Sequence, residues 1–248
     1  MHNGRDSMLT NDIEKDRQTL EALSPEALLA WAAQRFKGEM LFSTSLGAED
    51  CVILDMIFQQ KLPITVASIE TGVLFEETYA LWSRLEKRYD INIVSMRTDL
   101  LPVDGPPSPE IDELWKSEPD RCCHLRKIVP LRRELDRYQA WITGIRREQS
   151  EARRNARAIE WDLTFGLVKI NPLVNWKQAE VWDYLRKHDV PYNPLHDAGY
   201  PSIGCEPCTA QVQVGQDERA GRWQGREKTE CGLHEGAPSP VVLHKNKT

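Results

Sequence analysis

The sequence lacks any long uninterrupted hydrophobic run. A helix needs roughly 18 apolar residues in a row to cross a membrane, and no stretch of this chain reaches that length. The segment from Met1 to Leu20 is also too polar to serve as the apolar part of a secretory signal peptide. We therefore expect a cytoplasmic protein that does not enter a membrane.

The chain also lacks an excess of positive charge. It has 32 lysines and arginines against 38 aspartates and glutamates, so its formal net charge is −6. General nucleic-acid binding needs a basic surface for phosphates, and this balance argues against it. Internal repeats and low-complexity segments are missing too. Hydrophobic residues make up 40% of the 248 residues, which is enough for the core of one large α/β domain.

Short apolar segments alternate with helical segments along most of the chain. Such alternation predicts βαβ units and an α/β fold with a doubly wound parallel sheet. The expected strands are 40–44, 64–69, 91–96, 140–143 and 167–170, and the expected helices are 12–37, 49–60, 76–89, 120–135 and 177–188. Beyond about Pro191 the periodicity is lost and the sequence becomes rich in Gly, Pro, Cys and charge. This part is expected to be an extended tail that helps to form a site.

Polar motifs follow several of the expected strands. Parallel sheets bind ligands at the carboxyl ends of their strands, so these motifs are candidate ligand-binding residues. Hydroxyl groups and backbone N–H groups at a helix start favour a phosphate, and arginine forks match phosphate and sulfate oxygens. The candidates are Ser43, Thr44, Ser45 and Gly47 after the first strand, Thr71 and Gly72 after the second, and Arg146 after the fourth. Helix capping, a tight turn and a solvated arginine face are the structural alternatives.

Cysteine is scarce, with six in the chain. In a reducing compartment such cysteines are typically metal ligands or redox nucleophiles rather than disulfides. Four of them form the pairs Cys122–Cys123 and Cys205–Cys208, a set that suits a tetrahedral zinc or a cubane iron–sulfur cluster. Adjacent side chains diverge, which favours a cluster with separate iron atoms over a single zinc ion. Burial as ordinary core thiols is the alternative for the adjacent pair, and Cys51 is interpreted as such a core residue.

Cys231 stands apart from the other cysteines. Nearby cations lower the pKa of a thiol and make it reactive, and both Lys228 and His234 lie three residues away. Arg219 and Arg222 lie upstream. Cys231 is therefore a candidate nucleophile, with an incidental thiol in a disordered tail as the alternative.

The chain resembles the assimilatory adenylyl-sulfate reductases, the iron–sulfur branch of the phosphosulfate reductase family. The resemblance covers roughly residues 41–234, and agreement by chance over so many fixed positions is negligible. Its motifs are Glu70–Thr78, Cys122–Lys127, Thr143–Ser150, Ser202–Thr209 and Gly221–His234. It implies an adenine-nucleotide alpha hydrolase-like domain over residues 1–212, which includes the cluster cysteines, and a mobile segment over 213–248 that carries the nucleophile.

The resemblance also implies a reaction. Adenosine 5′-phosphosulfate would bind in the Ser43–Gly47 loop, Cys231 would attack the sulfur, and AMP would leave an S-sulfocysteine on the enzyme. Thioredoxin or glutaredoxin would then release sulfite by thiol exchange. Cations at Lys127, Arg146, Arg219 and Arg222 would offset the oxygen charge, with His234 as a further binding residue. A [4Fe-4S] cluster on the four paired cysteines would tune the site electrostatically, and a homo-oligomer is expected.

Two other functions compete with this interpretation. Reductases specific for the 3′-phosphorylated substrate usually lack the cluster cysteines, although a dual-specificity enzyme would keep them. A non-catalytic zinc or redox-sensing module would use the cysteines for structure alone. An ATP-splitting relative is disfavoured, because Ser43–Asp50 has a single glycine where those relatives show a Ser-Gly-Gly-x-Asp-Ser loop.

Overall fold

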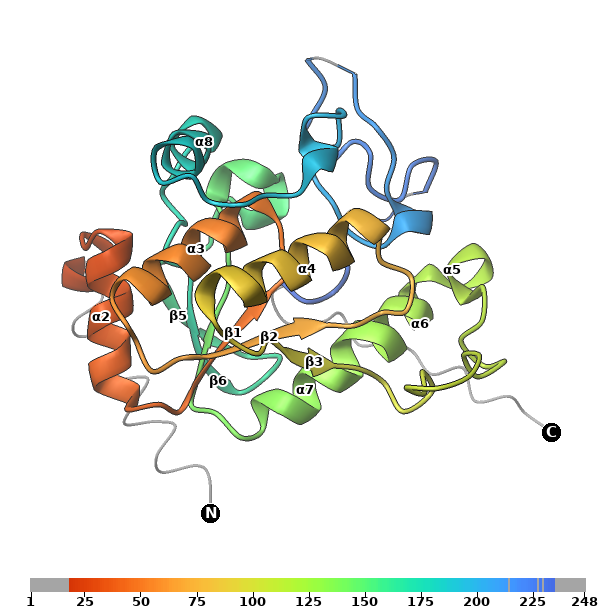
Figure 1. Ribbon diagram of the computed structural model, residues 1–248, viewed down its shortest axis with the longest axis horizontal. Helices are drawn as coiled ribbons and strands as arrows, with labels where there is room; N and C mark the ends of the chain where they lie inside the picture. Colours follow the sequence, from red (N-terminus) through yellow and green to blue (C-terminus); the bar gives the residue numbers. More distant parts are fainter. Residues whose placement is uncertain (1–17, 214, 227, 229, 235–248) are drawn as a thin grey trace.

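The computed structural model describes residues 18–213, 215–226, 228 and 230–234. Its centre is a six-stranded sheet in the order β3-β2-β1-β4-β6-β5, in which every neighbouring pair is parallel except β5 with β6 (Figure 1). The strands are β1 (Met40–Thr44), β2 (Thr65–Ile69), β3 (Val94–Met96), β4 (Ala140–Ile142), β5 (Ile159–Asp162) and β6 (Leu167–Ile170). The predicted α/β fold is confirmed, with an antiparallel strand added at one edge.

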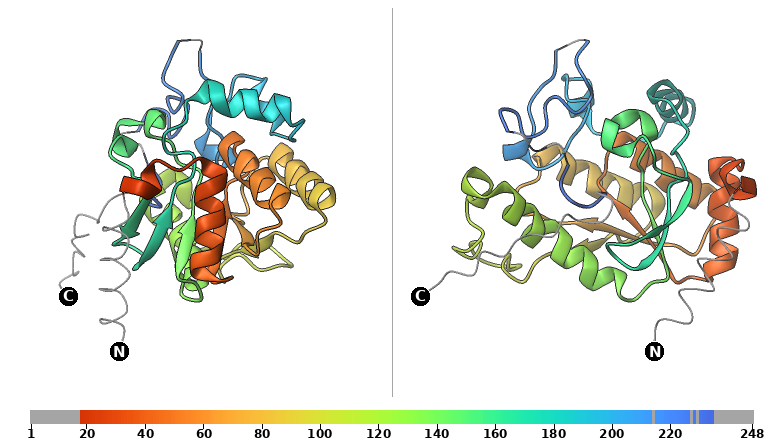
Figure 2. Two further views of the ribbon diagram at one scale, coloured as in Figure 1. Left: turned by 90° about the vertical axis from the view of Figure 1, so that its left-hand side faces the viewer. Right: turned by 180° about the vertical axis from the view of Figure 1, so that it is seen from behind.

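Helices cover both faces of the sheet (Figure 2). The α-helices labelled in Figure 1 are α2 (Pro25–Phe36), α3 (Ala48–Gln59), α4 (Glu76–Tyr89), α5 (Leu114–Ser117), α6 (Pro119–Cys123), α7 (Val129–Leu135) and α8 (Gln178–Lys187). A π-helical turn, η1 (His124–Ile128), joins α6 to α7, and the 3₁₀ helices are η2 (Arg147–Gln149), η3 (Glu151–Arg153), η4 (Pro194–His196) and η5 (Glu206–Cys208). None of the helices in the described part of the chain combines the length and the apolarity that a membrane crossing requires.

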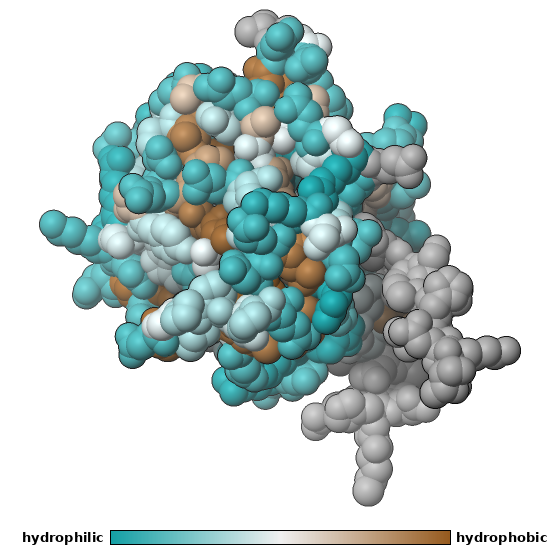
Figure 3. Space-filling model, turned by 90° about the vertical axis from the view of Figure 1, so that its right-hand side faces the viewer, coloured by the Kyte–Doolittle hydropathy of each residue, from teal (hydrophilic) through white to brown (hydrophobic). Residues whose placement is uncertain are grey.

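The strands bury both of their faces, as expected for a parallel sheet between two helical layers. Met40 and Phe42 of β1 belong to the larger core cluster, which α2, α3, α4 and α8 complete. Leu41, between them, packs on the opposite face with Leu131 of α7. The face of the molecule in Figure 3 is largely hydrophilic, with hydrophobic residues scattered among polar ones.

The path of the chain creates a switch point beside β1. The chain runs from β1 outward to β2 and β3, then returns to place β4 on the other side of β1. The loops that follow β1 and β4 therefore leave in opposite directions, and the crevice between them is the usual ligand site in such a sheet. This topology brings Ser43–Gly47 and Thr143–Arg146 to the same edge.

The helix predicted over residues 12–37 is wrong in its extent. The structure has helical residues at 18–21 and then a separate helix that begins at Pro25. Ser24 is extended (ψ 158°), and its side chain caps the new helix by accepting a hydrogen bond from the Ala27 N–H. A residue before proline is disfavoured in the helical region, which explains the break. Residues 12–17 lie outside the described part of the chain.

Three further elements differ from the prediction. The single helix predicted over 120–135 contains the π turn η1, because Pro130 has no N–H to donate to the Arg126 carbonyl and the regular ladder fails there. Strand β5 was not predicted, and it pairs antiparallel with β6 from Ile159 to Asp162. The strand expected over 91–96 is shorter and covers Val94–Met96.

Candidate active site

A pocket of about 170 Å³ lies at the carboxyl edge of the sheet. Its walls come from the loops after β1, β2 and β4, from the cysteine-bearing segments and from the C-terminal segment. It brings together most of the residues predicted from the sequence: Ser43, Thr44, Ser45, Gly47, Thr71, Lys127, Arg219, Arg222, Cys231 and His234 all line it. Gly72 and Arg146 do not line it. The N–H of Gly72 donates to Glu70 Oε1 (2.5 Å) instead.

The loop after β1 is shaped by Asp50 at the start of α3. The Ser45 hydroxyl donates to Asp50 Oδ2 (2.7 Å), and the Ser45 backbone N–H donates to the same oxygen. Burial raises the pKa of Asp50 to about 6, although the two Ser45 hydrogen bonds act to lower it. Gly47 precedes α3 without a side-chain cap in the described structure, so the first backbone N–H groups of this helix are a natural place for an anion.

Gly144 lets the β4 loop approach this carboxylate closely. A Cβ atom at residue 144 would lie 2.0 Å from Asp50 Oδ1, which is far inside van der Waals contact. The two sides of the switch point therefore meet at Asp50 and Gly144. Neither residue was predicted, although Gly144 sits in the Thr143–Ser150 motif.

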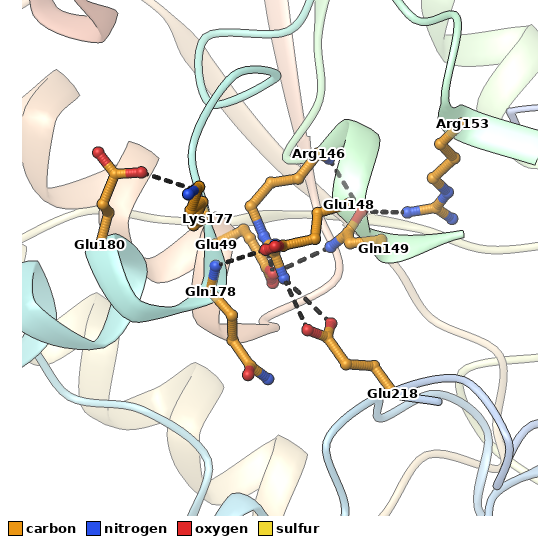
Figure 4. A network of polar contacts seen from close by, with 9 residues as sticks. All are labelled: Glu49, Arg146, Glu148, Gln149, Arg153, Lys177, Gln178, Glu180 and Glu218. Atoms are coloured by element: carbon orange, nitrogen blue, oxygen red, sulfur yellow. Dashed lines mark hydrogen bonds and ion pairs between the residues drawn. The ribbon is translucent and has the colours of Figure 1, made fainter. Parts of the chain in front are cut away.

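Arg146 is the centre of a carboxylate network rather than a free cation in the pocket. Its guanidinium is completely buried and donates to Glu49 (2.8 Å), Glu148 (3.2 Å) and Glu218 (3.0 Å). Figure 4 shows these side chains pointing toward one another. Glu49 belongs to α3, Glu148 to η2 and Glu218 to the C-terminal segment, so Arg146 joins three parts of the chain at the border of the pocket.

Arg153 is a pocket residue that sequence reasoning did not single out. It belongs to a run of arginines, for most of which a solvated helix face is the expectation from the sequence: Arg146, Arg147, Arg153, Arg154 and Arg157. Its side chain is 9% exposed, lines the pocket and forms a buried ion pair with Glu230 (3.0 Å). The available signal was its position three residues after Ser150, because residues this close in a helical turn share a face.

Lys127 connects the pocket with the paired cysteines and lines both. Burial lowers the pKa of its ammonium group, but the thiols of Cys205, Cys231 and Cys123 outweigh burial and raise it. Burial likewise raises the pKa of Cys205, while Lys127 and the Thr71 hydroxyl lower it, and the net shift is downward. The pair Lys127 and Cys205 therefore favours the charged form of both groups.

The four paired cysteines surround a second, much smaller pocket. Cys122, Cys123, Cys205 and Cys208 all line it, together with Trp115, Pro207 and Trp223. All four thiols are free, and three of them are buried. Within the described residues, no three His, Cys, Asp or Glu side chains converge in the way that holding one metal ion requires. The side chains bring four soft donors to one small cavity without focusing them on one point.

Two buried polar atoms beside these cysteines have no acceptor. Trp223 Nε1 and Arg126 Nε find no hydrogen-bond partner within the described structure, and both residues line the small pocket. The remaining Arg126 nitrogens are held by the Ile111 carbonyl (2.7 Å) and by the Thr71 carbonyl. Orphaned buried donors are rare in proteins, so this cavity offers donors to an acceptor that the chain itself does not supply.

The C-terminal segment carries Cys231 and His234 into the larger pocket. The His234 ring stacks on Trp141, with centroids 5.5 Å apart and planes at 18°. Trp141 Nε1 also donates to Ser43 Oγ (2.6 Å), so one buried indole contacts both the first loop and the C-terminal segment. Burial holds the pKa of His234 well below its usual range, and Lys169, Arg153 and Arg219 act in the same direction.

This combination defines a class of protein. A doubly wound parallel sheet with a polar loop and a helix N-terminus at its switch point is typical of nucleotide-binding α/β domains, and here a cysteine and several cations line the same pocket. Residues 39–211 match the phosphoadenosine phosphosulfate reductase domain, and the chain belongs to that family.

Curated relatives agree with this assignment. The chain is 46% identical over 215 residues to the adenosine 5′-phosphosulfate reductase of Salinibacter ruber, covering 86% of this chain and 85% of the relative. It is 44% identical over 228 residues to the protein of the same name from Bacillus anthracis, covering 92% and 99%. The relative from Halalkalibacterium halodurans, also so named, is 41% identical over 231 residues, covering 93% and 100%.

Solved structures place the fold in the same group. The crystal structure of phosphoadenylyl-sulfate reductase from Candida auris in a phosphate complex aligns with a TM-score of 0.68 and 34% identity, covering 81% of this chain and 96% of the other. The FMN adenylyltransferase of Candida glabrata, in complex with FAD and inorganic pyrophosphate, aligns with a TM-score of 0.55 and 16% identity, covering 88% and 78%. The second likeness concerns the fold alone.

Proposed function

We propose that this protein is an oxidoreductase that reduces adenosine 5′-phosphosulfate to sulfite and AMP in sulfate assimilation. The observation that carries the proposal is the convergence of Cys231, Lys127, Arg219 and Arg222 on one pocket beside the Ser43–Gly47 loop. A thiol there faces cations that match a phosphosulfate, and the relatives that cover most of the chain bear the name of this enzyme.

The proposed reaction consists of three successive thiol attacks. The Cys231 thiolate attacks the sulfur of the bound phosphosulfate, the bond between sulfur and the phosphate oxygen breaks, and AMP leaves with that electron pair. The cations of Lys127, Arg219 and Arg222 stabilise the charge on the sulfur and phosphate oxygens during this step. A thiol of thioredoxin or glutaredoxin then attacks Cys231 Sγ and releases sulfite. Its second thiol resolves the mixed disulfide, so the donor leaves oxidised.

The position of Cys231 in the pocket suggests that the C-terminal segment moves during the reaction. Cys231 is only partly exposed inside the pocket, and a protein thiol donor needs direct access to its sulfur. We propose that the described part of the chain from residue 213 onward forms a mobile segment on the predicted α/β domain of residues 1–212, and that the segment withdraws to present the S-sulfocysteine to the donor. Of the two predicted units, 1–212 and 213–248, residues 1–17, 214, 227, 229 and 235–248 lie outside the described part of the chain. A cytoplasmic homo-oligomer is part of the same proposal.

The four paired cysteines fit a [4Fe-4S] cluster. They would supply four thiolates around one cavity without converging on a single point. Trp223 Nε1 and Arg126 Nε could donate hydrogen bonds to the sulfur atoms of such a cluster. When bound, the cluster would change the electrostatic potential at the site. Protein purified without oxygen is expected to be brown, with broad visible absorption. A colourless protein loaded with zinc would contradict the cluster.

The 3′-phosphorylated nucleotide is the second candidate substrate. The solved relative at 34% identity is named for that activity, whereas the curated relatives at 41–46% are named for the unphosphorylated substrate. We therefore expect kcat/KM to be higher for adenosine 5′-phosphosulfate. Measuring both substrates with the same preparation tests this choice, and a preference for the 3′-phosphate would reverse it.

Sulfite release with thioredoxin as donor tests the activity itself. We expect the wild-type protein to release sulfite and Cys231→Ser to release none, while both keep the brown colour. Cys51→Ala is the matched control, because Cys51 is a buried core thiol outside the pocket lining and its removal is expected to leave sulfite release intact. Loss of the colour in Cys231→Ser would instead make Cys231 a cluster ligand.

A further inference from the structure

Glu230 lies directly before the proposed nucleophile, and its side chain is only 3% exposed. Its carboxylate accepts two hydrogen bonds from Arg153, through Nε and Nη2, at 3.0 Å each. Arg219 Nη2 (3.0 Å) and the Ser150 hydroxyl (3.2 Å) donate to it as well. A carboxylate offers about four acceptor sites, and these four hydrogen bonds occupy them. We call this set of contacts from Arg153, Arg219 and Ser150 the Glu230 clamp.

The clamp is attached to the rigid part of the site. Arg153 Nη1 donates to Gln149 Oε1 (2.6 Å), which also accepts from the Arg146 backbone N–H (3.0 Å). Gln149 Nε2 in turn donates to Glu49 Oε1 on α3 (2.9 Å). Figure 4 shows Gln149 between Arg153 and Glu49. A continuous chain of hydrogen bonds therefore joins Glu230 to α3, the helix that follows the Ser43–Gly47 loop.

The residue on the other side of Cys231 is a glycine. Gly232 has φ +83°, a backbone conformation that side chains other than glycine rarely adopt. Beyond it, Leu233 packs against the core cluster that contains Trp141, and the His234 ring stacks on Trp141. Rotation at residue 232 would move the thiol unless the residue before it is held. The bidentate fork of Arg153 fixes both the position and the plane of the Glu230 carboxylate, and the neighbouring Cys231 with it.

We propose that Glu230 is a positioning residue, whose clamp by Arg153, Arg219 and Ser150 fixes the place of Cys231 Sγ in the pocket. The inference rests on the proposed function, since it concerns how the thiol reaches the bound phosphosulfate. Glu230 does not serve as a base, because its oxygens are already occupied by guanidinium and hydroxyl donors. Glu230 itself does not line the pocket, so its effect falls on the rate of sulfur transfer more than on nucleotide binding, which it reaches through Arg219 and Arg153.

The test is Glu230→Gln in the full-length protein. Glutamine keeps the shape but turns an NH₂ group toward guanidinium donors, so the clamp opens on one side. With adenosine 5′-phosphosulfate and no reductant, we expect the single-turnover rate of S-sulfocysteine formation to fall about 10²-fold, as for small misplacements of a reacting group. The affinity for AMP is expected to fall much less than this rate, and the visible spectrum is expected to stay unchanged.

Two other variants accompany it. Glu151→Gln is the matched control, because Glu151 is exposed and pairs with Arg154 on the surface, and we expect no change in rate. Ser150→Ala removes one hydrogen bond and leaves the ion pairs, so it is expected to slow the transfer less than Glu230→Gln does. It keeps the proposal testable if Glu230→Gln fails to fold.

The possible results distinguish a failure of the positioning role from a failure of the proposed function. A wild-type rate of adduct formation in Glu230→Gln, or in Ser150→Ala if that is the only folded variant, would overturn the positioning role. A loss of AMP affinity as large as the loss of rate would also overturn it, because the effect would then be structural. If the wild-type protein forms no adduct, the proposed function fails instead. Alkylation of Cys231 by a neutral maleimide then still measures the clamp, which predicts faster labelling in Glu230→Gln.

Discussion

Asp50 is a pocket residue whose protonation is altered by the fold. Its buried carboxyl has a pKa raised from 3.8 to about 6. Below pH 3.8 the folded and unfolded states are both protonated, so the group has no effect on the free energy of unfolding. As the pH rises toward 6, the unfolded state ionises first and stability is lost. Above pH 6 the shift corresponds to about 3 kcal/mol of lost stability.

Asp50→Asn is therefore expected to stabilise the protein at neutral pH. The amide stays neutral, and its oxygen still accepts from Ser45. Urea unfolding at pH 4 and pH 7.5 measures the difference in unfolding free energy between the variant and the wild type. We expect that difference to grow in favour of the variant by up to about 3 kcal/mol between the two pH values. An equal difference at both would contradict a raised pKa.

Gly144→Ala is expected to destabilise the same corner of the pocket. The new Cβ would lie 2.0 Å from Asp50 Oδ1, so the carboxylate must move and lose its bonds to Ser45. Overpacking of this kind typically costs about 1–3 kcal/mol, measured by urea unfolding. Asp50→Ala removes the clashing atoms, and Gly144→Ala should then cost much less in that background. The same cost in both backgrounds would show that the clash is not its source.

Some pocket residues could be predicted from the sequence and others could not. Ser43 and Thr71 could be predicted because polar residues after parallel strands meet at one edge. Arg146 was predicted to contact the substrate, but the structure surrounds it with carboxylates from distant segments, and such pairing has no local signal. Arg153 was grouped with solvated arginines for the same reason, since its partner Glu230 lies 77 residues away.

At the scale of elements, helix α2 is a clear case of local chemistry that sets a boundary. Ser24 and Pro25 start it, and the side chain of Ser24 accepts from the Ala27 N–H (3.2 Å). Ser24→Ala is expected to lower the free energy of unfolding by about 1 kcal/mol, measured by urea unfolding. Sulfite release should not change, because α2 lies outside the pocket lining. A loss of activity without a loss of stability would contradict this separation.

The elements that could not be predicted depend on tertiary context. The alternation of apolar and helical segments was enough for five parallel strands, since their burial on two faces leaves a strong pattern. Strand β5 is short and amphipathic, and it forms only because β6 offers an open edge. The π turn after Cys123 has a local cause in Pro130, but its position beside the cysteine pair could not be read from helix periodicity.

At the scale of the whole molecule, the sheet and the C-terminal segment build one site. The sheet brings the Ser43–Gly47 loop and Gly144 to the switch point. The C-terminal segment adds Arg219, Arg222 and Cys231, which lie beyond residue 200 in the sequence. Sequence motifs indicated both parts, while their convergence required the fold. The paired cysteines occupy the adjoining cavity, and Lys127 lines both.

The central claim is that Cys231 attacks the sulfur of a nucleotide phosphosulfate. Mass spectrometry of the protein incubated with adenosine 5′-phosphosulfate and no reductant tests it most directly. We expect a mass gain of one sulfonate group, located on Cys231 and reversed by thioredoxin with release of sulfite. An unmodified Cys231, or the same gain on another cysteine, would contradict it.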